Sequence, residues 1–200
     1  MLDDIPAAMR SRMAELEALD RAQRAGAAPP ARWLRTVDRE AGRLITVLAG
    51  CAPRAGTFVE LGTGSGYSTL WLLLALRERA PRPRLVTIER DADKASLARV
   101  TFERCAVTEL VEQRVGDAAS ELRTLGPLAF AFMDHGPSNY EACRDGLVTA
   151  LVPGGLLAVD NVDSHRRLAA RFMRRLAADP RVETCVLHVG KGILLARRRR

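Results

Sequence analysis

The sequence predicts a doubly wound, Rossmann-like α/β fold, in which helices cover both faces of a mostly parallel seven-stranded sheet. Two observations lead to this prediction. From Thr57 onward, apolar runs of strand length alternate with stretches of helical periodicity, which is typical of parallel strands joined by right-handed crossovers. The first run also ends in an acid and a glycine-rich turn, residues 60–67, that leads into a helix.

The N-terminal segment, residues 1–50, is expected to be helical and to belong to the same domain as residues 51–200. Apolar residues between positions 5 and 19 recur at steps of three and four, which places them on one face of a helix. The glycine- and proline-containing run at 26–30 ends that helix. A second helical pattern follows at 37–48 and leads to the first strand.

The rest of the chain supplies the alternating elements. The expected strands are Thr57–Leu61, Arg84–Ile88, Glu112–Val115, Leu128–Met133, Leu156–Val159, Val182–Val189 and Ile193–Ala196. The expected helices are Ser68–Arg79, Ala92–Cys105, Asn139–Leu151 and Ser164–Ala178. The pattern contains no internal repeat and no second domain.

The composition suits one globular domain, because 48% of the 200 residues are hydrophobic and 28% are charged. No secretory signal pattern is visible, and the longest strongly apolar run, at 70–76, is far shorter than the roughly 20 residues of a membrane-spanning helix. We therefore expect a cytoplasmic protein without a membrane segment. The four cysteines form no C-x-x-C pair, which argues against a zinc or redox site.

The formal net charge of +7 favours nucleic-acid binding only weakly. Four of the seven excess charges lie in the terminal run Arg197–Arg200. All basic residues except Lys94 and Lys191 are arginine, a bias that genome composition also produces. A specific role in RNA binding is therefore the less favoured interpretation.

Glycines alternate at positions 62, 64 and 66, shortly after the acid Glu60. Glycine permits positive φ angles and lets the backbone approach a ligand closely, so this turn predicts a nucleoside-cofactor site. In a dinucleotide fingerprint, G-x-G-x-x-G, the last glycine would fall at Tyr67. The tyrosine makes an NAD oxidoreductase a remote alternative.

Each of the first five predicted strands has an acid, or a turn that carries one, at its carboxyl end: Glu60, Glu89, Asp117, Asp134 and Asp160. In open α/β sheets the ligand crevice lies at the carboxyl ends of the strands, so these carboxylates are expected on one rim. Such a rim repels phosphates and attracts a cationic cofactor or a divalent metal. S-adenosylmethionine fits, because it carries a sulfonium, an ammonium and ribose hydroxyls but no phosphate.

These residues resemble a known class of enzymes. Residues 60–67 are similar to motif I of the class I S-adenosylmethionine-dependent methyltransferases. Glu89, after Val86-Thr87-Ile88, resembles their ribose-binding acid, and Val115-Gly116-Asp117-Ala118 resembles the turn that lines the adenine. The resemblance implies a methyltransferase with this fold.

A narrower resemblance is to the cation-dependent O-methyltransferases of the catechol and caffeoyl-CoA type. It lies in Met133-Asp134-His135 with Tyr140, and in the run 154–161 that ends in Asp160-Asn161, and it extends from about Val37 to Arg197. It implies methyl transfer to a phenolic or catechol-like hydroxyl of a small molecule, Mg²⁺ or a similar cation, and a homodimer.

The resemblance also implies the site residues. Those expected to contact the cofactor are Val37, Glu60, Gly62, Thr63, Gly64, Ser65, Ser68, Glu89, Asp117, Ala118 and Asp134. The metal ligands would be Asp134, Asp160 and Asn161, whose hard oxygen donors suit Mg²⁺. Asp134, His135 and Lys191 are the candidate catalytic residues.

The chain departs from the family pattern at the residues that would accept the proton of the acceptor hydroxyl. The family's general-base lysine is here Pro137, the second acid of the caffeoyl-CoA branch is Gly136, and its acid-glycine pair near the last strands is Lys191-Gly192. A coordinated phenol would then lose its proton to water, to His135 or to Lys191.

Other interpretations stay open on the sequence alone. The acids at 134 and 160 and the amide at 161 could instead cap the helices that follow them. The acceptor could be a modified uridine in tRNA, which the arginine-rich tail favours weakly. The missing lysine is also compatible with a protein that binds the cofactor without catalysis.

Overall fold

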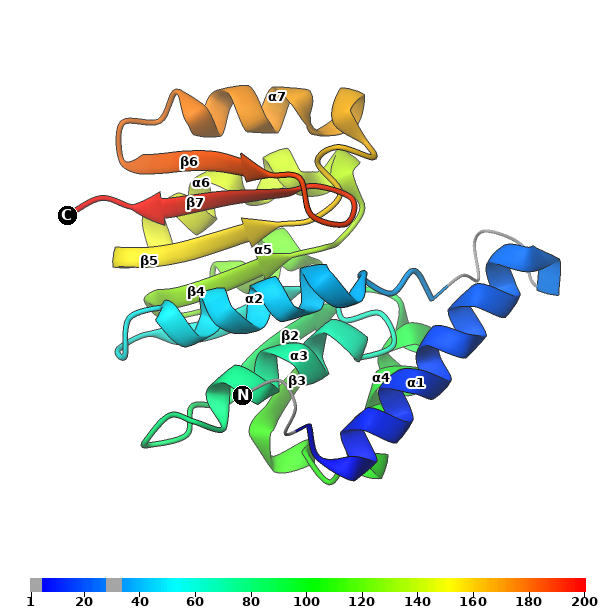
Figure 1. Ribbon diagram of the computed structural model, residues 1–200. Coiled ribbons are helices and arrows are strands. Elements are labelled where there is room, and N and C mark those ends of the chain that lie inside the picture. The colour runs from blue at the N-terminus through cyan, green and yellow to red at the C-terminus, as the bar shows by residue number, and fades with distance from the viewer. Residues whose placement is uncertain (1–4, 28–33) are drawn as a thin grey trace.

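The computed structural model describes residues 5–27 and 34–200, and its strands form a seven-stranded sheet in the order β3-β2-β1-β4-β5-β7-β6 (Figure 1). β1 to β5 pair in parallel, and β7 runs antiparallel to β5 and β6. The predicted doubly wound fold is therefore confirmed. The strands are β1 Thr57–Leu61, β2 Leu85–Glu89, β3 Val111–Val115, β4 Leu128–Met133, β5 Leu151–Val159, β6 Val182–Leu187 and β7 Ile193–Arg198.

Helices cover both faces of this sheet. Figure 1 shows α2 and α3 in front of the strands, and α5 and α6 behind them. The helices are α1 Ala7–Ala22, α2 Arg39–Cys51, α3 Tyr67–Leu76, α4 Ala92–Arg104, α5 Ala118–Leu122, α6 Tyr140–Ala150 and α7 Arg166–Ala177. Shorter helical turns are η1 Gln23–Ala27, η3 Thr108–Leu110 and η4 Pro137–Asn139.

Side chains of the central strands alternate between two apolar clusters. Phe58, Phe130 and Phe132 pack with α1 to α4 on one face. Val59 and Met133 pack with α5, α6 and α7 on the other. This alternation follows from the two-residue period of a strand, and it explains why strands buried on both faces are apolar throughout. The predicted N-terminal helices α1 and α2 thus share a core with α3 and α4.

The prediction misplaced the start of β5 by five residues and missed one short helix. β5 begins at Leu151 and continues through Pro153-Gly154-Gly155, which form an irregularity within the strand. The pairing with β4 shifts register at this point, between Leu128 and Phe130. α5 was not predicted, because five residues are too few to show a helical period.

The first helix ends as its glycine suggests, since Gly26 in η1 has a φ of 108°. Residues 28–30 of the predicted break, and the first four residues, lie outside the described residues. Within residues 5–27 and 34–200, the helices are too short or too polar to cross a membrane.

The strand order reverses between β1 and β4, which sets the crevice of a doubly wound sheet at their carboxyl ends. Backbone hydrogen bonds continue beyond the strands here. The N–H of Asp134 donates to the carbonyl of Leu61 at 2.9 Å, and that of Asp160 to Met133 at 3.0 Å. The first loop residues after β1, β4 and β5 are therefore held side by side.

Candidate active site

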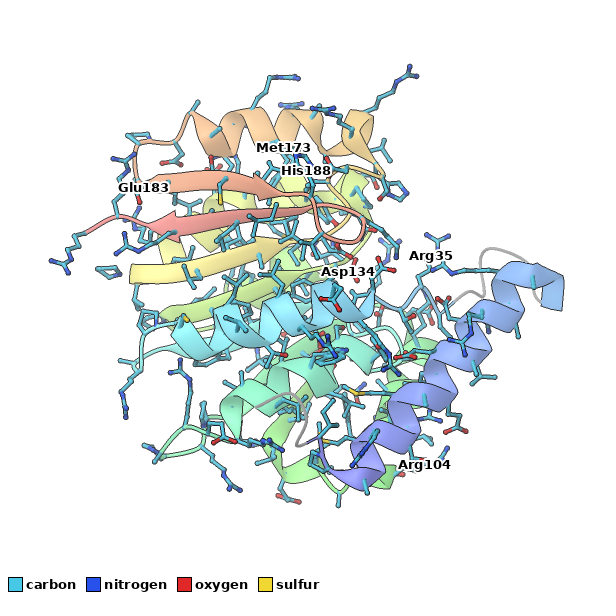
Figure 2. The ribbon with its side chains drawn as sticks, viewed as in Figure 1. Arg35, Arg104, Asp134, Met173, Glu183 and His188 are labelled. Carbon is cyan, nitrogen blue, oxygen red and sulfur yellow. The ribbon has the colours of Figure 1, made fainter. Side chains whose placement is uncertain are left out.

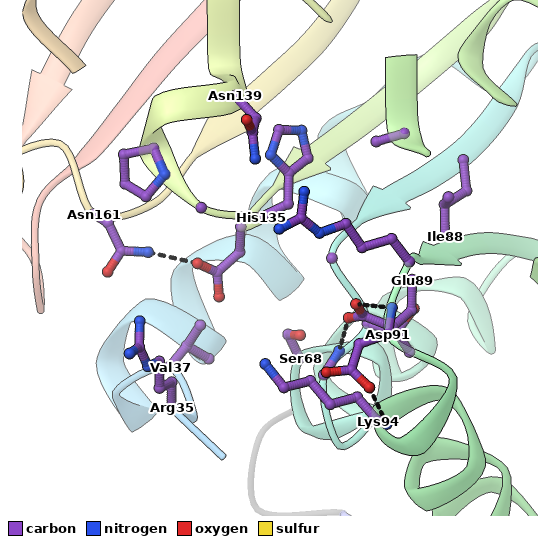
Figure 3. A pocket seen from close by; sticks show the side chains of 18 of the residues that line it. Arg35, Val37, Ser68, Ile88, Glu89, Asp91, Lys94, His135, Asn139 and Asn161 are labelled. Carbon is purple, nitrogen blue, oxygen red and sulfur yellow. Dashed lines mark hydrogen bonds between the residues drawn. The ribbon is translucent and has the colours of Figure 1, made fainter. Parts of the chain in front are cut away.

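A cavity of about 770 Å³ lies at the carboxyl edge of the sheet (Figure 3). Its walls come from the loops after β1 to β4, residues 62–65, 88–91, 116–119 and 134–139, and from residues 34–37 ahead of α2. The predicted site residues that line it are Val37, Gly62, Thr63, Gly64, Ser65, Ser68, Glu89, Asp117, Ala118, Asp134, His135, Asn161 and Lys191. Two predicted site residues, Glu60 and Asp160, do not line it.

The glycine loop has the conformation that its sequence predicts. Gly62, Gly64 and Gly66 have φ angles of 99°, 54° and 83°, which other residues rarely adopt. A Cβ atom on Gly62 would lie 2.8 Å from the carbonyl oxygen of Asp134, so the two loops touch through backbone alone. A Cβ on Gly64 would meet only the carbonyl of Leu34, at 3.8 Å, and the backbone of this residue therefore faces open space.

Glu60 lies beneath the cavity and does not line it, so the prediction that its side chain contacts the cofactor directly is corrected. Its carboxylate is fully buried and accepts hydrogen bonds of 2.6 Å from the hydroxyls of Ser68, Thr69 and Thr87. Burial outweighs these bonds and raises the pKa of Glu60 to about 7. Glu60 thus fixes the start of α3, where Ser68 lines the cavity.

Two acids on the cavity wall are held by backbone N–H groups. Glu89 accepts from Gly64 at 2.9 Å and from Asp91 at 3.0 Å, one bond to each oxygen. Asp117 accepts from Ser120 at 3.0 Å and caps α5, which lowers the pKa of its carboxyl group. Each oxygen can accept a further bond, so both acids can receive hydroxyl or amino donors of a nucleoside.

Asp134, Asp160 and Asn161 meet at the ends of β4 and β5. Nδ2 of Asn161 donates to Oδ1 of Asp134 at 2.5 Å, a bond drawn in Figure 3. Asp160 is 2% exposed, and its Oδ1 has no hydrogen-bond partner among the described residues. Burial, then repulsion by Asp160, raises the pKa of Asp134 well above its usual value, and burial raises that of Asp160 to about 6.

This trio fits a hard cation. A metal ion would give the buried Oδ1 of Asp160 the partner that it lacks. A flip of the Asn161 side-chain amide would present its oxygen to the same ion. The positive charge would also offset the repulsion between Asp134 and Asp160. Among the described residues, no group of three His, Cys, Asp or Glu side chains is placed to hold a metal ion, so a cation here would also need the Asn161 amide.

The capping alternative for these residues does not hold. The residue that precedes α7 is His165, without a side-chain cap, and Gly136 and Asn139 hold the corresponding positions before η4 and α6. The backbone of Asn161 has a φ of 65°, which is strained for a residue other than glycine. The trio is therefore not explained by helix capping.

His135 and Lys191 differ in their surroundings. Nε2 of His135 lies 3.4 Å from Sγ of Cys143, its Nδ1 is buried with no hydrogen-bond partner in the described part of the chain, and burial lowers the pKa of the imidazole. Lys191, in the turn between β6 and β7, donates from Nζ to the carbonyl of Thr36 at 3.3 Å. Its positive charge offsets part of the rise in the pKa of Asp134 and of Asp160, which burial keeps above their usual values. Lys191 thus lies beside the trio, whereas the ring of His135 is largely buried and packs against Cys143.

Helix α1 supports the glycine loop from outside, which the sequence did not reveal. The hydroxyl of Tyr67 donates to Glu17 at 2.6 Å, and Arg39 holds that carboxylate through two bonds of 2.9 and 3.0 Å. The buried Arg12 donates to the Thr101 hydroxyl, which donates to the carbonyl of Ser65 at 2.7 Å. These long-range partners share no pattern in the sequence that would have predicted them.

The fold and the site together define a class I S-adenosylmethionine-dependent methyltransferase. Solved structures agree. The chain is 27% identical, with a TM-score of 0.77, to an O-methyltransferase from Bacillus cereus in complex with S-adenosylhomocysteine, covering 94% of this chain and 91% of that one. It is 28% identical, with a TM-score of 0.75, to the O-methyltransferase TomG from Streptomyces achromogenes in complex with S-adenosylmethionine, covering 92% and 89%.

Sequence comparison assigns the chain to a narrower family within this class. A family profile described as O-methyltransferase matches residues 11–199, and the chain belongs to this O-methyltransferase family. A catechol O-methyltransferase from Mycobacterium tuberculosis is 36% identical over 128 residues, which span 63% of this chain but only 56% of that enzyme. Caffeoyl-CoA O-methyltransferase 2 from Zea mays is 30% identical over 190 residues, covering 82% of this chain and 70% of the maize enzyme.

Proposed function

We propose that this protein transfers the methyl group of S-adenosylmethionine to a phenolic or catechol-like hydroxyl of a small molecule, with a divalent cation such as Mg²⁺ bound by Asp134, Asp160 and Asn161. The observation that carries the proposal is the position of this trio, with its orphaned Asp160 oxygen, at the edge of a cavity shaped by a methyltransferase glycine loop. Hard oxygen donors would thus stand beside the methyl donor.

The chain's own residues bind and orient the cofactor in this proposal. S-adenosylmethionine supplies an electrophilic methyl group on a positively charged sulfur. Glu89 accepts ribose hydroxyls, Asp117 and Ala118 border the adenine, and Val37 covers the ligand from the segment ahead of α2. Glu60 acts through Ser68 and the start of α3, because its carboxylate is fully buried and accepts three hydroxyl hydrogen bonds within the protein.

The metal trio orients the acceptor. Mg²⁺, when bound, supplies positive charge that makes a vicinal diol more acidic. Asp134 and Asp160 fix that charge at the carboxyl ends of β4 and β5, and the hydrogen bond from the Tyr140 hydroxyl to the Asp160 carbonyl, 3.0 Å long, braces the loop from below. The acceptor oxygen is thereby held near the methyl group, which favours transfer by proximity.

We propose that Lys191 receives the acceptor's proton as the neutral amine, after its ammonium group has released a proton to solvent. Pro137, in the place of the family lysine, has no proton-accepting side chain. His135 is less suitable, because its Nε2 faces Cys143 and its Nδ1 is buried. Lys191 donates to the Thr36 carbonyl and acts electrostatically on Asp134 and Asp160, so its amine lies beside the proposed metal site.

Methyl transfer to a panel of catechols, with and without EDTA, tests the proposal. We expect turnover that the chelator abolishes and added Mg²⁺ restores, together with binding of S-adenosylhomocysteine in calorimetry. Transfer to tRNA but not to any diol would replace the acceptor, and cofactor binding without transfer to either would leave a non-catalytic homologue. No heat with S-adenosylhomocysteine would overturn the assignment of the cavity.

The homodimer and the cytoplasmic location stay predictions. Sedimentation of the purified protein tests the first, and fractionation of its native cells tests the second.

A further inference from the structure

The end of the cavity near the metal trio is polar and carries positive charge. The residues that line it beside Asp134 and Asn161 include Arg35, Ser164 and Lys191. The aromatic side chains that line the cavity among residues 5–27 and 34–200 are Tyr67 and His135. Polar groups at the metal end offer further contacts that can orient an aromatic acceptor.

Arg35 belongs to a strap, residues 34–38, that α1 holds against the cavity. The buried Asp20 accepts from the N–H of Arg35 at 3.0 Å and from the hydroxyl of Thr36 at 3.0 Å. The N–H of Leu34 donates to the side chain of Gln23 at 2.8 Å. Figure 2 shows Arg35 on the α1 side of the cavity that Asp134 lines.

The backbone at Arg35 is strained, with a φ of 53°. A non-glycine residue in this region costs energy and persists only where surrounding contacts enforce it, as Asp20 does here. Glycine would adopt the same backbone conformation without strain. The arginine side chain at this position is therefore better explained by what it contacts than by the turn itself.

The strap brings this arginine to the acceptor. Lys191 donates to the carbonyl of Thr36, the next residue, and Lys191 also acts electrostatically on Asp134 and Asp160. Figure 3 shows Arg35 on the same side of the cavity as Asn161, whereas Lys94 and Asp91 lie on the other side. Arg35 thus lies at the metal end, away from the acids expected to bind ribose.

We infer that Arg35 is a specificity-determining residue that binds a carboxylate on the methyl acceptor, so that the preferred substrates are ortho-dihydroxy compounds carrying an anionic group. This inference rests on the proposed function. With the charges of Asp134 and Asp160 offset by a divalent cation, the guanidinium of Arg35 adds positive charge at this end of the cavity. A guanidinium pairs with a carboxylate through two parallel hydrogen bonds, which also fixes the direction of the ring.

Two isosteric acceptors test the inference: 3,4-dihydroxybenzoate, which is anionic at neutral pH, and 3,4-dihydroxybenzamide, which is neutral. We expect kcat/KM to be about tenfold higher for the acid, and Arg35→Gln to remove most of that preference by raising KM for the acid with little change in kcat. Calorimetric affinity for the acid, measured on protein saturated with S-adenosylhomocysteine and Mg²⁺, should fall by a similar factor.

Two further variants separate charge recognition from damage to the strap. Arg35→Lys keeps the charge and should retain part of the preference. Arg43→Gln removes an exposed charge on α2 and should leave the ratio unchanged. Equal kcat/KM for acid and amide in the wild type, or a ratio that Arg35→Gln does not alter, would refute the inference alone. Methylation of neither compound nor of any other diol would refute the proposed function itself.

Discussion

The substitution Glu60→Gln tests how the buried acid under the cofactor loop affects stability. Glu60 is fully buried and accepts three hydroxyl hydrogen bonds, yet its pKa is raised from 4.5 to about 7, because loss of hydration costs the charged form more than these bonds return. The protonated acid is therefore the form that the fold prefers below neutral pH. Glutamine has nearly the same shape and stays neutral at every pH.

The magnitude follows from the difference between the folded and unfolded pKa values. Between pH 4.5 and 7 the folded protein holds a proton that the unfolded chain has released, so stability falls as the pH rises. The contribution is fully present below pH 4.5 and is lost above pH 7. At about 1.4 kcal/mol per pKa unit, the loss amounts to about 3 kcal/mol over the full window.

Denaturant unfolding of both proteins at pH 5, 6, 7 and 8, without cofactor, measures this effect. The free energy of unfolding of Glu60→Gln minus that of the wild type should rise by about 2 to 3 kcal/mol from pH 5 to pH 8. Asp134 and Asp160 titrate in both proteins, so their contributions largely cancel in the difference. A difference that is flat with pH would show that Glu60 is ionised throughout, and would refute the reasoning.

Three further substitutions address the site. Asp160→Ala should abolish metal-dependent turnover and leave the calorimetric affinity for S-adenosylhomocysteine nearly intact, because the residue lies outside the cavity lining; unchanged turnover would rule out its metal role. Glu89→Ala should weaken cofactor binding by about 1 to 3 kcal/mol through loss of charge-assisted hydrogen bonds, and equal affinity would remove Glu89 from the site. Tyr67→Phe removes the bond to Glu17 and should weaken cofactor binding by about 1 kcal/mol, about fivefold, if α1 holds the loop. In a Glu17→Gln background the effect of Tyr67→Phe should be smaller, and full additivity of the two changes would argue against that contact.

The sequence was most informative where local rules decide the structure. Alternate glycines before a helix demand positive φ angles, and the three glycines adopt them. Strands buried on both faces must be apolar, so β1 and β4 were predicted with their observed bounds. Glycine and proline inside β5 misled the prediction, because the strand continues past them only through the pairing of β4 with Leu151 and Leu156 on either side.

The candidate site divides in the same way. The acids at the strand ends were readable, because the carboxyl ends of parallel strands share an edge of the sheet. Which of them line the cavity was not readable, because that depends on where side chains point after packing. Glu60 turns under the loop to meet three hydroxyls, while Glu89 and Asp134 face the cavity.

By itself, the sequence determined the class of fold, the glycine loop and the placing of acids at the carboxyl ends of the strands, since each follows from backbone conformation or strand periodicity within a few residues. Only the tertiary structure decided how distant segments meet. Asp20 places Arg35 at the cavity and Lys191 reaches the strap from the last turn of the sheet. Those contacts join residues 15 to 155 positions apart, and their geometry exists only once the two clusters of the core have packed.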